Sequence, residues 1–136
     1  MDSDVVSWKR IESLTDILVK KVKSTKREFK SISTISRGGL VPARLMADRL
    51  NINKILVDKH KIPSNSLFVD DIFDSGDTFK KILLASENPS KLTYATLFAR
   101  KGKKYPKQLI FATKTKGAEY IVYPWDKFEH KGLKFQ

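Results

Sequence analysis

The stretch that decides the fold is SLFVDDIFDSGDT, residues 66–78. Its unbroken apolar centre is typical of a strand that is buried on both faces of a parallel sheet. Four acids, Asp70, Asp71, Asp74 and Asp77, then fall within eight residues, although the chain carries a formal net charge of +12. Like charges this close repel one another. The cluster therefore predicts a bound partner at the end of this strand.

The composition indicates an ordinary folded protein. With 136 residues, of which 40% are hydrophobic, the chain has room for one core, and we expect a single domain over residues 1–136. Cysteine is absent, which excludes disulfide bonds and thiolate metal sites. The first residues, MDSDVVSWKR, show no signal-peptide pattern, and no apolar run approaches a membrane span. We expect a cytoplasmic protein without a membrane partner.

The positive charge has two interpretations. It could mark a surface for nucleic acid or another polyphosphate. Alternatively, the lysines form a solvated surface, with Lys20, Lys21 and Lys23 on the wet face of a helix. The chain has no arginine-rich run and no interleaving of basic and aromatic residues. This favours the solvated surface and makes a nucleic-acid partner the weaker hypothesis.

Hydrophobic spacing predicts alternating helices and strands. Ser7 is a plausible N-cap for a first helix over about 7–25. Strands are expected at about 31–36, 54–57, 66–72, 92–99 and 108–113, with a last short strand in EYIVYPW (119–125), and further helices over about 40–51 and 78–86. This order predicts an α/β fold with a mostly parallel central sheet flanked by helices.

Two glycine turns each join a strand to a helix, where ligands bind in parallel sheets. In the turn at 74–78, Gly76 lets an anion approach the free amides of a helix N-terminus, and Ser75 and Thr78 add hydroxyl donors. This favours a phosphate. Asp70 and Asp71 are acceptors, which suit sugar hydroxyls and the waters of Mg²⁺. The second turn, SRGG at 36–39, combines the planar charged fork of Arg37 with two glycines and also suits an anion.

The segment LFVDDIFDSGDT resembles the signature of the type I phosphoribosyltransferases, which bind phosphoribosyl pyrophosphate (PRPP). Three further segments, VSWKRIESL, TISRGGLVPARLMADRL (34–50) and YIVYPWD (120–126), are similar to the xanthine-guanine and related 6-oxopurine members. The resemblance covers nearly all of the chain. It implies the type I phosphoribosyltransferase fold with a small base-binding hood.

The resemblance also implies roles for the residues of both turns. Asp70 and Asp71 match residues that hold the ribose hydroxyls, directly or through water bound to Mg²⁺. The loop that matches the family's 5′-phosphate site comprises Asp74, Ser75, Gly76, Asp77 and Thr78, and the pyrophosphate loop comprises Ser36, Arg37, Gly38 and Gly39. Asp74 matches the usual candidate for the general base, and a carboxylate there could accept a proton as the base attacks C1′.

The base pocket follows from the same resemblance. Tyr120 matches an aromatic residue that stacks on the purine, and Ile121 would contact the base edge through its backbone. The segment LFARKG aligns with one whose lysine donates to the purine O6, and the match falls on Lys101 or Arg100. A cationic donor there favours a 6-oxo over a 6-amino group.

The segment between the second and third core strands is short for this family. Only DKHKIPSNS (58–66) is available as a lid over the site, although Lys59, Lys61 or another subunit could contribute a cover. We expect an enzyme that converts PRPP and guanine, hypoxanthine or xanthine to a nucleoside 5′-monophosphate and pyrophosphate, in a homo-oligomer (dimer or tetramer). The alternatives are a non-catalytic PRPP- or nucleotide-binding regulatory protein and a basic nucleic-acid-binding protein.

Overall fold

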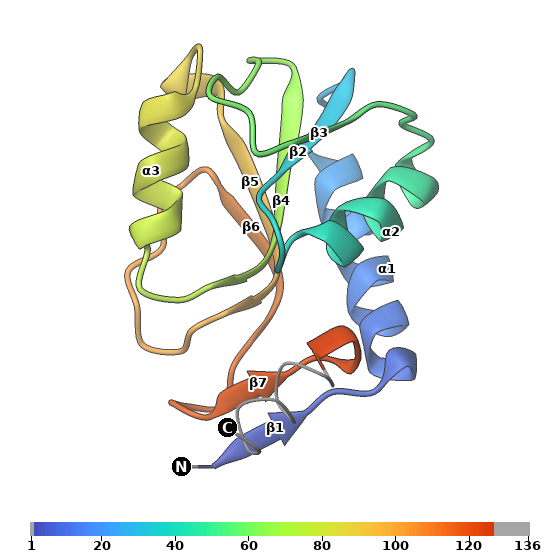
Figure 1. Ribbon diagram of the computed structural model, residues 1–136, viewed down its shortest axis with the longest axis vertical. Coiled ribbons are helices and arrows are strands. Elements are labelled where there is room, and N and C mark those ends of the chain that lie inside the picture. The colour runs from blue at the N-terminus through green and yellow to red at the C-terminus, as the bar shows by residue number, and fades with distance from the viewer. Residues whose placement is uncertain (1, 127–136) are drawn as a thin grey trace.

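The computed structural model describes residues 2–126 and contains a five-stranded sheet. Its strands are β2 (Ser31–Thr34), β3 (Ile55–Val57), β4 (Ser66–Phe73), β5 (Thr93–Ala99) and β6 (Leu109–Lys114), in the order β3-β2-β4-β5-β6 (Figure 1). All four pairings are parallel. The predicted α/β fold with a parallel central sheet is confirmed.

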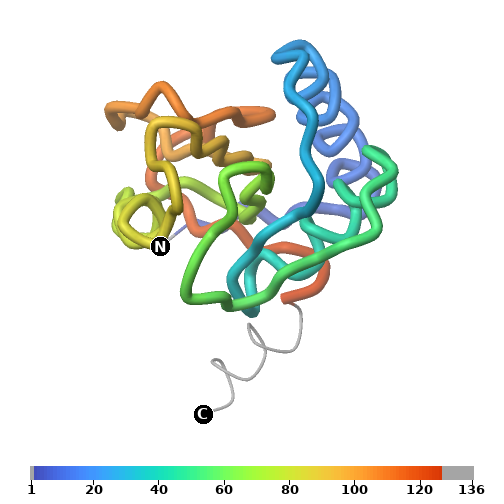
Figure 2. The backbone as a smooth tube through the Cα atoms, turned by 90° about the horizontal axis from the view of Figure 1, so that it is seen from above, coloured from blue at the N-terminus to red at the C-terminus, as the bar shows by residue number. Residues whose placement is uncertain are grey.

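Helices cover both faces of this sheet. Helices α1 (Trp8–Ser24) and α2 (Leu40–Leu50) lie on one face and α3 (Asp77–Ala85) on the other, as Figure 2 shows from above. The predicted cap of the first helix is present, since Arg10 N donates to Ser7 Oγ over 3.1 Å. No helix within residues 2–126 is long and apolar enough to cross a bilayer.

The position of β4 in the middle of the sheet accounts for its apolar sequence. Leu67 and Val69 pack into the core cluster that includes α1 and α2, whereas Phe68, between them, packs into the cluster that includes α3. Successive side chains of a strand point to opposite faces, and both faces are covered here. Because both faces of β4 are buried, residues 67–69 must all be apolar.

A second, small sheet lies beyond the carboxyl ends of the main strands (Figure 1). It pairs β1 (Ser3–Val5) with β7 (Tyr120–Val122) in parallel, with Asp4 opposite Ile121. The sequence predicts β7, which overlaps the apolar run IVY at 121–123, but not β1, because SDV at 3–5 has two polar residues and no apolar run. The small sheet occupies the position expected for the hood.

The remaining connections are short. Residues 100–108 join the parallel strands β5 and β6 without a helix, and the ring of Tyr105 anchors this segment against Phe73 and Phe111, with ring centroids 6.0 and 5.1 Å away. Two 3₁₀ turns, η1 (Pro89–Lys91) and η2 (Pro124–Asp126), complete the described chain.

Candidate active site

Asp70, which is buried, and Asp71, which is partly buried, form a pair of carboxylates near the carboxyl end of β4. Tyr94 Oη donates to Asp70 Oδ2 over 3.3 Å, and the Asp71 amide donates to Asp70 Oδ1 over 2.8 Å. Burial raises the pKa of Asp70, and burial together with the adjacent Asp70 charge raises the pKa of Asp71 well above its ordinary value. Two carboxylates held so close need a cation or hydroxyl donors as partners.

The turn that follows β4 presents unpaired backbone amides. Gly76 adopts a φ of +91°, which a side chain would disfavour, and lies next to the ring of Phe73. The Asp77 amide donates to Ser75 Oγ over 3.2 Å. The amides of Ser75, Gly76 and Thr78 have no hydrogen-bond partner within residues 2–126. This N-terminus of α3 therefore has the free donors that an anion site requires.

The glycine turn after β2 lies directly beside the carboxylate pair. A Cβ added to Gly38 would come within 2.8 Å of Asp71 Oδ2. A Cβ on Gly39 would lie 2.0 Å from Thr34 Oγ1. The Gly39 amide donates to the Ile35 carbonyl over 3.1 Å. Of the two glycines in this predicted anion-binding turn, Gly39 therefore has no free amide to offer, and its role is close backbone packing.

Ser36 is held by a residue that the sequence analysis missed. Asp58 accepts from the Ser36 amide over 2.8 Å and from the Ser36 hydroxyl over 2.5 Å. Asp58 itself has a φ of +54°, and its amide donates to the Thr34 carbonyl over 3.0 Å. These hydrogen bonds to Ser36 lower the pKa of Asp58. Arg37 is exposed at the tip of this turn.

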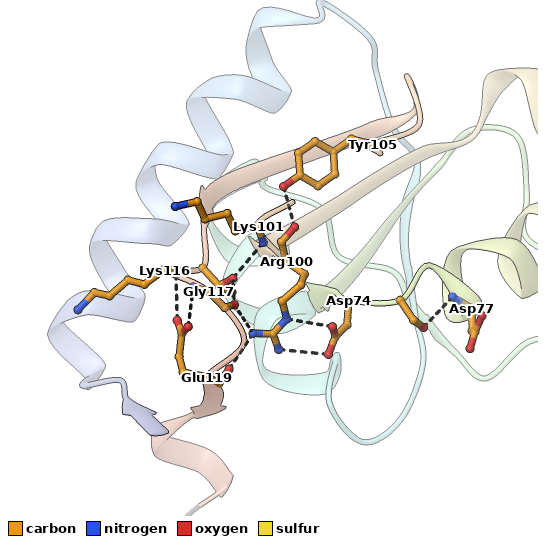
Figure 3. A network of polar contacts seen from close by, with 10 residues as sticks. Asp74, Asp77, Arg100, Lys101, Tyr105, Lys116, Gly117 and Glu119 are labelled. Atoms are coloured by element: carbon orange, nitrogen blue, oxygen red, sulfur yellow. Dashed lines mark hydrogen bonds and ion pairs between the residues drawn. The ribbon is translucent and has the colours of Figure 1, made fainter. Parts of the chain in front are cut away.

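Arg100 contacts Asp74 across the end of the sheet (Figure 3). Its Nε donates to Asp74 Oδ1 over 3.0 Å and its Nη2 to Asp74 Oδ2 over 3.2 Å. Nη1 donates to the carbonyls of Gly117 and Glu119, over 3.1 and 2.7 Å. Arg100 is largely buried, with 13% of its side chain exposed, whereas Asp74 is 56% exposed. The hydrogen bonds that Arg100 donates to Asp74 raise the pKa of Arg100 further.

Both candidates for the base-contacting cation border one cavity of about 710 Å³. The cavity is lined by Asp74, Arg100, Lys101, Lys103, Lys116 and Tyr120, together with the backbone around residue 117. Tyr120 is 44% exposed and Ile121 is buried. The Tyr120 amide and the Val122 carbonyl bond toward β1, so the peptide groups of Ile121 face the other side of β7. The structure brings these four candidates, Arg100, Lys101, Tyr120 and Ile121, to the same end of the sheet.

Lys59 lies away from this cavity. It borders a separate hollow of about 330 Å³ between the ends of β2 and β3 and helix α3, together with Asp58, His60 and Lys81. Lys61 does not line that hollow. The two lysines of the short segment after β3 are therefore not gathered on one site.

Two tyrosines next to the carboxylates were not identified from the sequence. Tyr94 lies opposite Phe68 in the β4–β5 register and is bonded to Asp70. Tyr123 is buried, its hydroxyl has no hydrogen-bond partner within residues 2–126, and burial together with the charges of Asp71 and Asp70 raises its pKa. Both appear in the sequence only as aromatic residues of apolar strands, so no local signal distinguishes them.

Comparison with known proteins points to one enzyme class. No protein-family model matches the chain. It is 26% identical over 144 residues to the xanthine-guanine phosphoribosyltransferase of Nitratidesulfovibrio vulgaris (strain DP4), an alignment that covers 92% of this chain and 78% of the relative. It is 28% identical over 142 residues to the enzyme of the same name from Chromohalobacter salexigens, with 89% and 82% covered.

Solved structures show the same fold. The xanthine-guanine-hypoxanthine phosphoribosyltransferase of Helicobacter pylori superposes with a TM-score of 0.72 at 19% identity, over 98% of this chain and 99% of the other. A hypothetical protein from Neisseria gonorrhoeae with bound ppGpp gives 0.72 at 20%, over 97% and 95%. The purine phosphoribosyltransferase of Pyrococcus horikoshii gives 0.68 at 20%, over 92% and 94%. With motifs, fold and relatives in agreement, the chain is similar in sequence to xanthine-guanine phosphoribosyltransferases, which are transferase enzymes, and has the type I phosphoribosyltransferase fold.

Proposed function

We propose that this protein transfers the phosphoribosyl group of PRPP to a purine base with a 6-oxo group. A ring nitrogen of the base attacks C1′ of the ribose, and the bond from C1′ to the pyrophosphate oxygen breaks. Pyrophosphate leaves with the bonding electrons, and the proton of the base passes to an acceptor. The products are a nucleoside 5′-monophosphate and pyrophosphate.

One observation carries the proposal, namely the convergence of three elements at one end of the sheet. The carboxylates of Asp70 and Asp71, the free amides of the turn at 74–78, and Gly38 beside Asp71 offer acceptors and donors next to one another. PRPP combines a diol with two anionic groups. In this proposal the carboxylates hold the ribose hydroxyls, and the turns at 74–78 and 36–39 hold the 5′-phosphate and the pyrophosphate.

In this proposal Asp74 and Arg37 take part in the reaction itself, as proton acceptor and as stabiliser of the leaving group. Asp74 stands between the phosphate turn and the base-side cavity, where its carboxylate can take the proton of the incoming base. Arg37 supplies a permanently charged donor to the departing pyrophosphate. Charge on the leaving group grows as the bond to C1′ breaks, so a fixed cation there stabilises the transition state more than the ground state.

We also propose Mg²⁺ as a cofactor that enters with its substrate. The donor set fits a hard cation, because Asp70 and Asp71 are adjacent carboxylates and carboxylate oxygens are ligands of Mg²⁺. No group of three or more His, Asp or Glu side chains forms a closed metal site in the described part of the chain. The ion would therefore be held by PRPP oxygens and water as well as by these two residues. When bound, it would neutralise charge on pyrophosphate.

A regulatory, non-catalytic role in binding PRPP or a nucleotide is the second candidate. Two observations favour it. The segment between β3 and β4, residues 58–65, is short for a lid that excludes water, and both carboxylate oxygens of Asp74 are occupied by Arg100. The Neisseria gonorrhoeae structure, which has bound ppGpp, provides a precedent on this fold. A cytoplasmic location and a homo-oligomeric state belong to both versions of the proposal.

A direct assay separates the two candidates. Release of pyrophosphate and formation of the monophosphate should be followed with PRPP, Mg²⁺ and each of guanine, hypoxanthine and xanthine. Calorimetric titration with guanosine monophosphate and with PRPP should accompany it. Turnover that is lost in Asp70→Asn and Asp71→Asn supports the enzyme. Tight nucleotide binding without turnover supports the regulator, and neither turnover nor binding overturns both.

A further inference from the structure

The base-side cavity is strongly cationic. Its volume is about 710 Å³, and three lysines, Lys101, Lys103 and Lys116, line it in addition to Arg100. In Figure 3 the side chains of Lys101 and Lys116 extend on the side of Arg100 that is opposite Asp74. Among the residues that line the cavity, Asp74 thus lies on one side of Arg100, and Lys101 and Lys116 lie on the other.

The carboxylates around this cavity already have partners. Asp74 is bonded to Arg100 through both oxygens. Glu119 accepts from the backbone amides of Lys116 and Gly117, over 2.9 and 2.7 Å, and these bonds contribute to its lowered pKa. By contrast, the ammonium groups of Lys101, Lys103 and Lys116 have no ion-pair or hydrogen-bond partner within residues 2–126.

A neutral base in the cavity would leave the positive charge of these three lysines unbalanced. Covering several ammonium groups with a neutral ring removes water from them and offers few acceptors in return. A ligand with a negative group would bind at a lower cost in desolvation free energy. Its carboxylate or ionised ring oxygen attracts all three lysines and so replaces part of their interaction with water. Four cations, Arg100 and the three lysines, face two carboxylates, so the local balance is positive by two charges.

We propose that the base-side cavity selects heterocyclic bases that carry a negative charge, and that Lys101, Lys103 and Lys116 hold this charge. This inference rests on the proposed function and narrows its acceptor from 6-oxopurines in general to anionic bases. The charge can come from a purine that ionises near neutral pH, such as xanthine, or from a carboxylated pyrimidine, such as orotate.

Matched pairs of bases test the proposal. Orotate and uracil differ by one carboxylate, and xanthine ionises more readily than hypoxanthine. Pyrophosphate release with PRPP should give kcat/KM values that favour the anionic member of at least one pair by about tenfold or more. The pair that responds identifies the source of the charge. Titration of the corresponding monophosphates, orotidylate against uridylate and xanthylate against inosinate, measures the same preference without turnover.

Charge-neutral variants connect the preference to the lysines. The double variant Lys103→Gln/Lys116→Gln should reduce the ratio of anionic to neutral kcat/KM by about tenfold, and adding Lys101→Gln should reduce it further. Lys91→Gln is the matched control, because Lys91 is exposed and precedes β5 at the opposite end of the sheet. Circular dichroism spectra before assay confirm that each variant is folded.

The outcomes separate this inference from the function on which it rests. No pyrophosphate release with any base, together with tighter binding of anionic monophosphates, would reject the enzyme and keep the charge preference. Turnover that is equal for both members of each pair, or faster with the neutral ones, would overturn the inference and keep the enzyme. A preference that survives in the triple variant would also overturn it, because the charge would then be recognised elsewhere.

Discussion

Arg100 joins two separate parts of the site through a single guanidinium group. Its Nε and Nη2 donate to Asp74 over 3.0 and 3.2 Å, and its Nη1 donates to the carbonyls of Gly117 and Glu119. The turn after β4 is thereby tied to the segment that leads into β7. Any motion of the base-side cavity relative to the phosphate turn must stretch or break these bonds.

Replacement of Arg100 by methionine should destabilise the protein. The change leaves two carbonyls and one carboxylate without their donor, and we expect the free energy of unfolding to fall by about 2 kcal/mol. Urea denaturation followed by circular dichroism measures this. Arg44→Met is the control, since Arg44 pairs with Asp48 at the surface with 73% and 58% exposure, and it should cost less than about 0.5 kcal/mol. Equal losses would show that the Arg100 contacts contribute no more than a surface ion pair.

Asp74→Asn should separate catalysis from binding. Asparagine keeps the shape of the side chain and removes the proton acceptor, so kcat should fall by about 10² to 10⁴. PRPP affinity, measured by titration, should change far less, because the turn at 74–78 is proposed to bind the 5′-phosphate through backbone amides. Asp48→Asn, on the exposed face of α2, serves as the control. Losses of equal size in kcat and in PRPP affinity would reject the proton-acceptor role.

Arg37→Ala should weaken the binding of the substrate PRPP and leave the binding of the monophosphate product nearly unchanged. The guanidinium is proposed to contact pyrophosphate, which PRPP carries and a nucleoside monophosphate lacks. Loss of a charged hydrogen-bond donor should weaken PRPP binding by about 10- to 100-fold. Titration of guanosine monophosphate should give nearly the wild-type affinity. An equal loss for both ligands would move Arg37 out of the pyrophosphate site.

The parts of the fold that follow from local chemistry were predictable. The apolar run at 67–69 predicts a doubly covered strand, Ser7 predicts the start of α1, and Gly76 predicts a turn between β4 and α3; the structure has all three. Each signal lies within a few residues of the feature it specifies. The strand β1 gives no such signal, because its three residues are ordered only by pairing with β7.

The contacts between side chains of the site could not be predicted, because they join residues that are far apart in the sequence. Asp58 meets Ser36 across 22 residues, and Arg100 meets Asp74 across 26. These contacts depend on the order β3-β2-β4-β5, which places the ends of strands that are distant in sequence next to one another. The sequence analysis could name Arg100 and Asp74 as site residues, but not that they contact each other.

Asp58 should contribute stability that depends on pH. Its pKa is lowered from 3.8 by hydrogen bonds from Ser36, so the stabilisation is present above the ordinary pKa and is lost as pH falls through the lowered one. Asp58→Asn keeps one acceptor and tolerates the positive φ. The gap in urea midpoint between wild type and Asp58→Asn should be full at pH 7 and should close in acid, below pH 3.8. A gap that stays constant across this range would show that the charge of Asp58 has no role.

Gly39→Ala should be the most damaging single change in the turn after β2. The added methyl group would lie 2.0 Å from Thr34 Oγ1 and 3.0 Å from the carbonyls of Ile35 and Val69. Because these backbone groups belong to or adjoin the central strands, they cannot move aside cheaply, and we expect a loss of about 3 kcal/mol. Gly117→Ala is the control: its nearest contact is 3.7 Å from the added atom, so it should cost less than about 0.5 kcal/mol. If Gly39→Ala unfolds in urea like the wild type, the turn must be able to shift away from β2 and β4, and the assigned role of Gly39 in close backbone packing would be wrong.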